Sequence, residues 1–227
     1  MDAATEGFDV VEEEVQAGGL RLTVAHPRDA EELIDEDAYA VDERLPYWAE
    51  LWPSARALAD TLATAPLRGA RVVELGCGVG LPALVAAMRG ARVLATDWYD
   101  EALGFTARNA ARAGVDVQVL RVDWREPPPA LLAAAPFDWV VAADVLYEER
   151  NGGALAALLP RLCGPATRVL IADPRRPHVA ALLDPLRAMG WGHEAEEVPV
   201  RGRRDESGGV IRLHRLTPPM TRAARER

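Results

Sequence analysis

The stretch RVVELGCGVGLPALVAAMRGARVLATD, residues 71–97, decides the fold class. It begins with a short apolar run, passes through glycines at positions 76, 78 and 80, and continues as a helix-forming segment. A second apolar run then ends at Asp97. A strand, a glycine-rich turn, a helix and a second strand in this order predict a β-α-β unit with parallel strands. Turns of this kind hold nucleotide-like cofactors, so the stretch also predicts a cofactor site.

The same alternation continues beyond this stretch. Strands are predicted at residues 71–75, 91–96, 117–122, 137–143 and 167–172, and helices at residues 81–89, 100–113, 151–162 and 178–189. Residues 190–200 and 208–216 are two further β-type runs with a polar segment between them, which is typical of an antiparallel hairpin. The pattern therefore predicts an α/β, Rossmann-like fold, with a mostly parallel sheet, helices on both faces and an antiparallel hairpin at the end.

The residues before this domain predict an extension. Residues 8–25 alternate apolar and polar around Gly18 and Gly19, as a β-hairpin does. A charged stretch at 28–45 is expected to be helical or irregular, and Pro53 is well placed to open a helix through about Ala65. We expect an N-terminal extension over residues 1–45, one domain over 46–216 and a frayed tail over 217–227.

Composition and charge limit the partners. The chain of 227 residues is 49% hydrophobic and has a net charge of −9, which argues against nucleic acid as its main partner. All 26 basic residues are arginines, which codon bias explains most simply. The two cysteines fit neither a metal set nor a disulfide framework. The N-terminus is acidic and no run reaches about 18 apolar residues, so we expect a cytoplasmic protein without metal or membrane contact.

The glycine turn fits one cofactor better than another. A dinucleotide site needs a small residue at the third position of G-x-G-x-x-G, but that position holds Leu81. Glu74 ends the first strand beside the place where a pyrophosphate would bind, and its carboxylate would repel the phosphates. A carboxylate there suits an ammonium group, such as that of S-adenosylmethionine.

Acidic residues also end the next two strands. Asp97 can accept hydrogen bonds from ribose hydroxyls, and Asp123 can accept one from an adenine amino group that Trp124 would cover. Each acid taken alone is explained as a solvated strand end. Because ligands of open α/β sheets bind beyond the carboxyl ends of the strands, the three acids together indicate a single S-adenosylmethionine crevice.

At these motifs the chain resembles the class I, seven-strand S-adenosylmethionine-dependent methyltransferases. VVELGCGVGLPAL is similar to the first motif of that family, VLATD to the second and VDW to the third, and the resemblance covers about residues 45–216. It implies a seven-stranded sheet whose last two strands form the antiparallel edge.

A methyl acceptor site is expected after the fourth strand. The run FDWVVAADVLYEE places Asp144 and Tyr147 three positions apart, where a carboxylate and a phenol can hold and orient an amine. The simpler alternative is that Tyr147 packs on the next helix and Asp144 caps a turn.

The run LPYWAELWPSARALA narrows the resemblance. Trp48 and Trp52 are four positions apart, as on one helical face; Trp48 suits core packing and Trp52 the cofactor rim. This run, together with D-P-x-R-P at residues 173–177 and D-x-x-Y at residues 144–147, resembles motifs of the protein lysine methyltransferases. The resemblance is greatest to the branch that acts on the electron transfer flavoprotein β subunit. The resemblance places Trp52, Glu74, Gly76, Gly78, Gly80, Leu81, Asp97, Trp98, Asp123, Trp124 and Ala143 at the cofactor, and Asp144 and Tyr147 at the acceptor as the catalytic pair. Leu81-Pro82 departs from the small residues of the flavoprotein branch.

These observations predict an N-methyltransferase acting on a protein lysine. A small-molecule amine and a non-catalytic S-adenosylmethionine-binding module remain as alternatives. A nicotinamide-dependent oxidoreductase is disfavoured by Glu74 and Leu81, and a nucleic-acid methyltransferase by charge and by the lack of an N-P-P-Y-like run. Arg175 and Arg176, after the fifth strand, either grip an acidic protein surface or are simply solvated.

Overall fold

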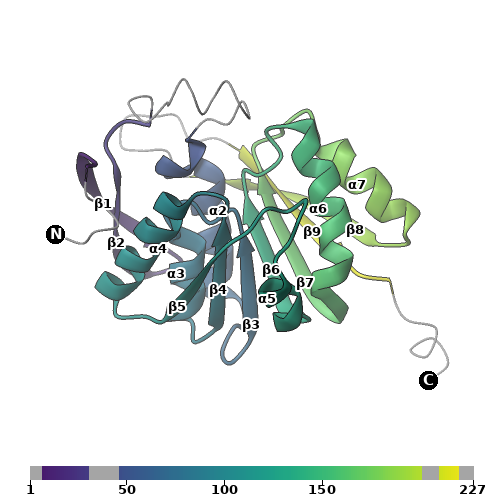
Figure 1. Ribbon diagram of the computed structural model, residues 1–227, viewed down its shortest axis with the longest axis horizontal. Helices are drawn as coiled ribbons and strands as arrows, with labels where there is room; N and C mark the ends of the chain where they lie inside the picture. Colours follow the sequence, from purple (N-terminus) through teal and green to yellow (C-terminus); the bar gives the residue numbers. More distant parts are fainter. Residues whose placement is uncertain (1–6, 31–45, 201–209, 220–227) are drawn as a thin grey trace.

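The computed structural model describes residues 7–30, 46–200 and 210–219, and in it strands and helices alternate from Arg71 to Pro199 (Figure 1). The main strands are β3 (Arg71–Leu75), β4 (Arg92–Asp97), β5 (Val117–Arg121), β6 (Phe137–Ala143), β7 (Cys163–Asp173), β8 (Gly192–Pro199) and β9 (Val210–Thr217). The helices are α2 (Pro53–Thr64), α3 (Leu81–Met88), α4 (Asp100–Ala113), α5 (Pro129–Ala134), α6 (Glu149–Leu162) and α7 (Val179–Ala188), with a short 3-10 helix, η3 (Tyr47–Ala49). Most of the charged 28–45 stretch and most of the expected frayed tail lie outside the described residues.

The seven strands form one sheet in the order β5-β4-β3-β6-β7-β9-β8. The pairs from β5 to β7 are parallel, whereas β9 pairs antiparallel with both β7 and β8. The expected class, a mostly parallel sheet closed by an antiparallel hairpin, is confirmed. The strand order reverses between β3 and β6, and ligands of such sheets bind beside this switch point.

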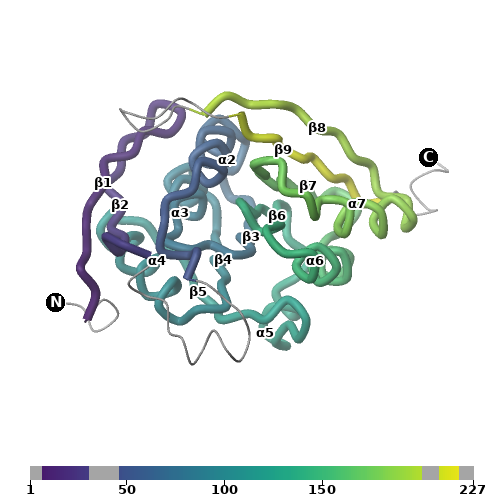
Figure 2. The backbone as a smooth tube through the Cα atoms, turned by 90° about the horizontal axis from the view of Figure 1, so that it is seen from above, coloured from purple at the N-terminus to yellow at the C-terminus, as the bar shows by residue number. Residues whose placement is uncertain are grey.

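Helices cover the sheet on both faces (Figure 2). Helices α2, α3 and α4 pack on one face in a core that includes Leu58, Leu84 and Phe105, all fully buried. Helices α5, α6 and α7 pack on the other face around Leu131 and Leu159.

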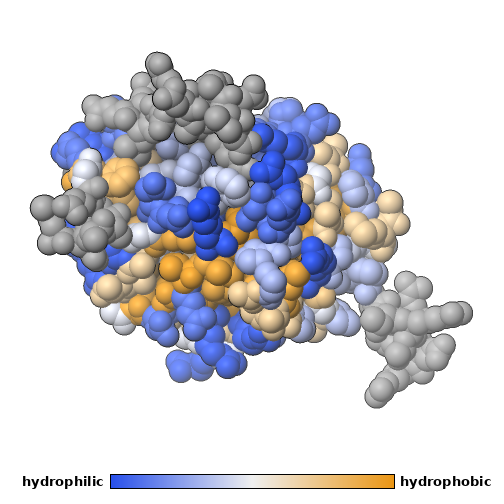
Figure 3. All heavy atoms as spheres, in the orientation of Figure 1, coloured by the Kyte–Doolittle hydropathy of each residue, from blue (hydrophilic) through white to orange (hydrophobic). Residues whose placement is uncertain are grey.

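On the face drawn in Figure 3, hydrophilic side chains lie above an apolar region in its middle. Within the described ranges, no helix has the length and apolar character that crossing a membrane requires.

The expected N-terminal hairpin is present as β1 (Val10–Ala17) and β2 (Leu20–Pro27), paired antiparallel. It packs on the domain, because Val15 and Val24 belong to the same apolar core as α2 and α4. The buried Asn109 side chain of α4 binds the hairpin through Ala25 of β2. It accepts a hydrogen bond from the Ala25 backbone N–H at 2.8 Å and donates one to the Ala25 carbonyl at 2.9 Å. The same amide donates to the Val79 carbonyl in the glycine turn at 2.9 Å.

Local sequence signals explain where the helices near the site begin and end. Pro53 opens α2 and Pro82 lies in the first turn of α3, where a missing backbone N–H has no cost. Helix α4 has acidic residues in its first turn, Arg112 in its last turn and a left-handed Gly114 directly after it, all of which favour those ends.

Candidate active site

One pocket opens where the parallel strands end, and it brings together residues from many parts of the chain. Of the positions expected at the cofactor or the acceptor, Trp52, Glu74, Gly76, Gly78, Leu81, Asp97, Trp98, Asp123, Trp124, Ala143, Asp144 and Tyr147 line it. Gly80 does not line it. A Cβ on Gly80, whose φ is 90°, would lie 2.7 Å from the Thr106 Oγ1 atom, so this glycine allows the turn to pack on α4.

The other two glycines of the turn lie at the pocket itself. Gly76 has φ 74°, and a Cβ there would lie 3.0 Å from the Val145 Cγ1 atom and 3.3 Å from the Trp124 ring. Gly78 has φ 53°, and its Cβ would lie 3.0 Å from the Trp48 carbonyl oxygen. Positive φ together with close neighbours explains why glycine occupies both positions.

Glu74 is an acid buried at the floor of the pocket. It is only 1% exposed, and its Oε2 atom has no hydrogen-bond partner among the described residues. Burial raises the pKa of this carboxyl well above its ordinary value, and a hydrogen bond from the Ala83 backbone offsets only part of the effect. An unpartnered carboxylate oxygen at this depth is a site for a cationic donor such as an ammonium group.

Asp97 is held in place by the backbone around it. Its Oδ2 atom accepts from the Gly78 backbone N–H at 2.9 Å and its Oδ1 atom from the Tyr99 N–H at 3.1 Å. A carboxylate has about four acceptor positions, so two backbone donors do not fill its capacity to accept hydrogen bonds.

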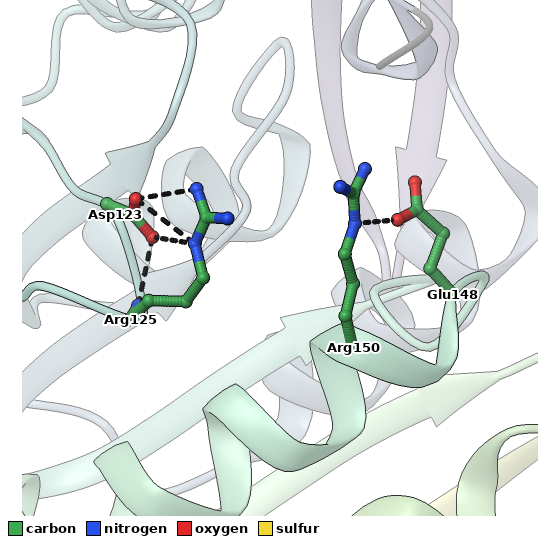
Figure 4. A network of polar contacts seen from close by, with 4 residues as sticks. All are labelled: Asp123, Arg125, Glu148 and Arg150. Carbon is green, nitrogen blue, oxygen red and sulfur yellow. Dashed lines mark hydrogen bonds and ion pairs between the residues drawn. The ribbon is translucent and has the colours of Figure 1, made fainter. Parts of the chain in front are cut away.

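Asp123 also lines the pocket, but it has a partner that the sequence did not indicate. Arg125 donates to it from its backbone N–H at 2.9 Å and from its side-chain Nη2 at 2.9 Å. Glu148 and Arg150 form a second ion pair at the same pocket (Figure 4). The adenine role of Asp123 therefore stays a prediction, and its carboxylate is oriented by Arg125.

At the acceptor end, Asp144 follows β6 in a left-handed conformation with φ 55°, which is unusual for a residue other than glycine. Its Oδ1 atom accepts from the Arg176 Nε–H at 2.9 Å. The Tyr147 ring lies 5.1 Å from that of Tyr47 between centroids, and burial raises the pKa of the Tyr147 phenol to about 12. The phenol is therefore neutral at physiological pH.

The two tryptophans before α2 differ in their roles. Trp48 is 8% exposed and packs against Phe8 and Phe105, as expected of a core residue. Trp52 lines the pocket and donates from Nε1 to the Tyr47 carbonyl at 2.6 Å. The expectation that they share one helical face is wrong, because Trp48 lies in η3 and Trp52 has extended backbone before α2.

Sequence reasoning missed several lining residues, namely Tyr47, Glu50, Tyr99, Arg125, Glu148, Arg150 and Asn151. Tyr47 had a usable signal, since it lies inside the aromatic run already noted.

The buried Trp124 Nε1–H has no hydrogen-bond partner among the described residues, so it is a second polar atom available to a ligand, beside Glu74 Oε2. No group of three possible metal-ligating side chains occurs in the part of the chain that the structure describes.

The pocket as a whole fits S-adenosylmethionine. Glu74 offers an unpartnered carboxylate oxygen for an ammonium, Asp97 offers acceptors for ribose hydroxyls, and Trp124 offers an aromatic ring. Asp144 and Tyr147 line the same pocket and can orient an acceptor amine.

Comparisons with known proteins agree with this geometry. Residues 48–181 match a family model described as lysine methyltransferase. The electron transfer flavoprotein beta subunit lysine methyltransferase of Xenopus laevis is 32% identical over 135 residues, covering 58% of this chain and 53% of that protein. A histone-arginine methyltransferase of Xenopus laevis is 34% identical over 110 residues, covering 46% and 47%.

Among solved structures, magnesium protoporphyrin IX methyltransferase from Synechocystis PCC 6803, with bound SAM, has a TM-score of 0.56 at 20% identity. That match covers 73% of this chain and 78% of the other, and it shows a shared fold. The chain spans about half the length of the curated relatives it matches. The lysine methyltransferase family model matches more than half of this chain, so the chain belongs to the lysine methyltransferase family.

Proposed function

We propose that this protein is an S-adenosylmethionine-dependent N-methyltransferase whose acceptor is a protein lysine. The observation that carries the proposal is the buried Glu74 carboxylate, which has an unpartnered oxygen in the same pocket as Asp144 and Tyr147. A methyl donor with an ammonium group needs a carboxylate such as Glu74, and an amine acceptor needs side chains that orient it, such as Asp144 and Tyr147. The names of the family and of the flavoprotein relative support lysine as the acceptor.

Each end of the pocket has its own task in the proposed reaction. When bound, S-adenosylmethionine supplies an electrophilic methyl group on a sulfonium. Glu74 would hold the ammonium of the methionine moiety, Asp97 would accept from the ribose hydroxyls, and Trp124 would contact the adenine. The pocket mouth carries Glu50, an exposed acid suited to a basic acceptor segment.

Asp144 and Tyr147 then orient the acceptor nitrogen. Only a neutral amine has the lone pair that attacks the methyl carbon, so a lysine must first lose a proton to water. The Tyr147 phenol, with its pKa of about 12, is no general base at neutral pH and acts through its ring and its hydroxyl. Most of the rate then comes from proximity and orientation.

Two measurements test this proposal. Calorimetric titration should show S-adenosylhomocysteine binding and no NADH binding, and the reverse result would overturn the cofactor assignment. Radiolabelled methyl transfer into cell lysate, with and without protease digestion, should place the label in protein. Amino-acid analysis of the labelled protein should find methyllysine. Methylarginine would favour the chemistry named for the histone-arginine relative, and label in small molecules alone would favour a metabolite acceptor.

We also propose that the protein works in the cytoplasm. Both cysteines are free thiols in the structure, and Cys77 is buried, which suits a reducing compartment. Fractionation of cells that express a tagged chain tests this location.

A further inference from the structure

The carboxylate expected to hold the acceptor amine is already paired with a cation. Asp144 has 5% of its side chain exposed, and its Oδ1 atom accepts from the Arg176 Nε–H at 2.9 Å. The Arg176 side chain is 35% exposed, so the pair lies at the border between the pocket and solvent. The contact with Asp144 raises the pKa of the guanidinium above its already high ordinary value. Arg176 is thus charged whenever the protein is folded.

The loop after β7 is built to place this guanidinium. The Arg176 backbone N–H donates to the Asp173 Oδ2 atom at 2.9 Å, and Asp173 is 1% exposed. Arg175, between them, adopts a left-handed φ of 68° and turns its side chain outward to Glu197, with a contact of 2.6 Å. Adjacent arginines therefore point in different directions, one to the acceptor carboxylate and one to the β8–β9 surface.

Other charged or titratable groups surround this end of the pocket. They are Tyr47 from η3, Asp97 and Tyr99 from the end of β4, Tyr147, Glu148 and Arg150 after β6, and Asp173 at the end of β7. Glu148 is paired with Arg150, and the Tyr147 phenol is neutral because burial raises its pKa to about 12. Arg176 is the cation that bonds directly to the Asp144 side chain.

Pairing changes what Asp144 does to a bound amine. A lone carboxylate within about 4–6 Å favours the ammonium form and raises the pKa of the amine by about 1–3 units. The ammonium cannot attack a methyl group, so an unpaired Asp144 would bind the substrate well and slow its reaction. The Arg176 guanidinium, bonded to the Oδ1 atom, offsets this attraction, and the Oδ2 atom can orient the amine.

We propose that Arg176 is a positioning residue for the methyl acceptor: it fixes the Asp144 carboxylate and offsets its charge, so that the acceptor lysine is held as a neutral amine. The lysine proton leaves to water at the pocket mouth. The nitrogen lone pair would then bond to the methyl carbon as the carbon–sulfur bond breaks, with the sulfur keeping that bond's electron pair in S-adenosylhomocysteine and the methylated nitrogen taking the positive charge. This inference rests on the proposed lysine methyl transfer and adds to it the residue that sets its pH range.

The test compares Arg176→Gln with Arg176→Lys and with the matched control Arg175→Gln. Each protein transfers radiolabelled methyl groups to desalted lysate protein between pH 6.5 and 9.5, at saturating S-adenosylmethionine. The rising limb of kcat against pH reports groups of the enzyme–substrate complex. S-adenosylhomocysteine titration of each variant shows whether the cofactor pocket is intact.

For Arg176→Gln, we expect the rising limb of kcat against pH to move up by about one pH unit. This is the lower end of the range of about 1–3 units for a nearby charge, because Arg176 is partly solvated. Its kcat should fall about tenfold at pH 7 and approach that of the wild type at pH 9.5, since one pH unit is a tenfold change in neutral amine. Arg176→Lys should keep the rising limb at the wild-type pH. Arg175→Gln should keep both the wild-type limb and the wild-type kcat.

Two results would overturn the inference. An Arg176→Gln variant that loses the same factor of kcat at every pH, with its limb unmoved, would give Arg176 a purely structural role. Loss of S-adenosylhomocysteine binding by the same variant would assign Arg176 to the cofactor pocket. Failure of the proposed function looks different, because the wild type itself would then label no protein lysine at any pH.

Discussion

Replacing Glu74 by glutamine removes the charge at the floor of the pocket and keeps the shape of the side chain. In the ligand-free protein, burial raises the pKa of this carboxyl well above its ordinary 4.5. Its Oε2 atom has no partner among the described residues. A cofactor ammonium would supply that partner and favour the ionised form, so binding should release a proton from Glu74.

The size of the effect follows from the type of bond. A hydrogen bond to a charged group contributes about 1.5–3 kcal/mol, which corresponds to an affinity change of about 10- to 150-fold. We therefore expect Glu74→Gln to weaken S-adenosylhomocysteine binding by at least tenfold. The number of protons released on binding should be smaller for Glu74→Gln than for the wild type.

Calorimetric titration in two buffers of different ionisation enthalpy measures both quantities. Work at about pH 6.5 keeps the ligand amino group protonated, because its ordinary pKa is about 7.7–8.0. The matched control is Glu50→Gln, which removes an exposed acid from the mouth of the same pocket and should change neither value. Glu74→Gln binding within twofold of the wild type, with unchanged proton release, would refute the reasoning.

The same variant has a second expected effect, on stability. A carboxyl whose folded pKa is raised keeps its proton in the native state after the unfolded chain has lost it. Ligand-free wild-type stability should therefore fall as pH rises above 4.5 through the folded pKa of Glu74. Thermal unfolding should show Glu74→Gln gaining stability relative to the wild type from pH 5 to pH 8.

Three further changes test other parts of the structure. Asp144→Ala should leave S-adenosylhomocysteine affinity within a few-fold and lower kcat/KM at least about 100-fold, because the amine loses its orientation; unchanged turnover would remove Asp144 from the site. Asn109→Ala leaves buried groups of Ala25 and Val79 unpaired and should reduce the free energy of unfolding in urea by about 2–4 kcal/mol. Burial lowers the pKa of His214 to about 4, so the unfolded chain binds this proton first and wild-type stability should drop by about 2 kcal/mol between pH 6.5 and 4. His214→Gln should lack that part of the drop.

Much of the fold follows from local patterns in the sequence. The bounds expected for β3, α4 and β6 agree with the structure, because each apolar run or amphipathic stretch ends at a clear signal such as Gly114. Helix α5 was missed, since six residues between prolines are too short to show a period. Strand β7 begins at Cys163, earlier than expected, because α6 runs into it without a loop and Cys163 pairs with Phe137.

The candidate site was predictable where topology alone decides position. Glu74 and Asp97 lie at the ends of β3 and β4 and Asp123 lies two residues beyond β5, so the sheet brings all three to one pocket. Which atoms are paired could not be predicted, because ion pairs depend on side-chain direction. Arg176 reaches Asp144 across 32 positions of sequence, and it follows a left-handed residue, Arg175, that the sequence pattern did not predict.

The position of β8 at one edge of the sheet bears on aggregation. An edge strand offers unpaired backbone N–H and C=O groups, to which a strand of another chain can add. Here Glu194, Glu196 and Glu197 are exposed on an eight-residue strand that ends in Pro199, which has no N–H to offer. Arginines of β9 form ion pairs with Glu196 and Glu197 within the chain, and both carboxylates keep their charge in these pairs. A second β8 laid alongside would bring like charges within about 5 Å, so this edge resists the growth of a continuous intermolecular sheet.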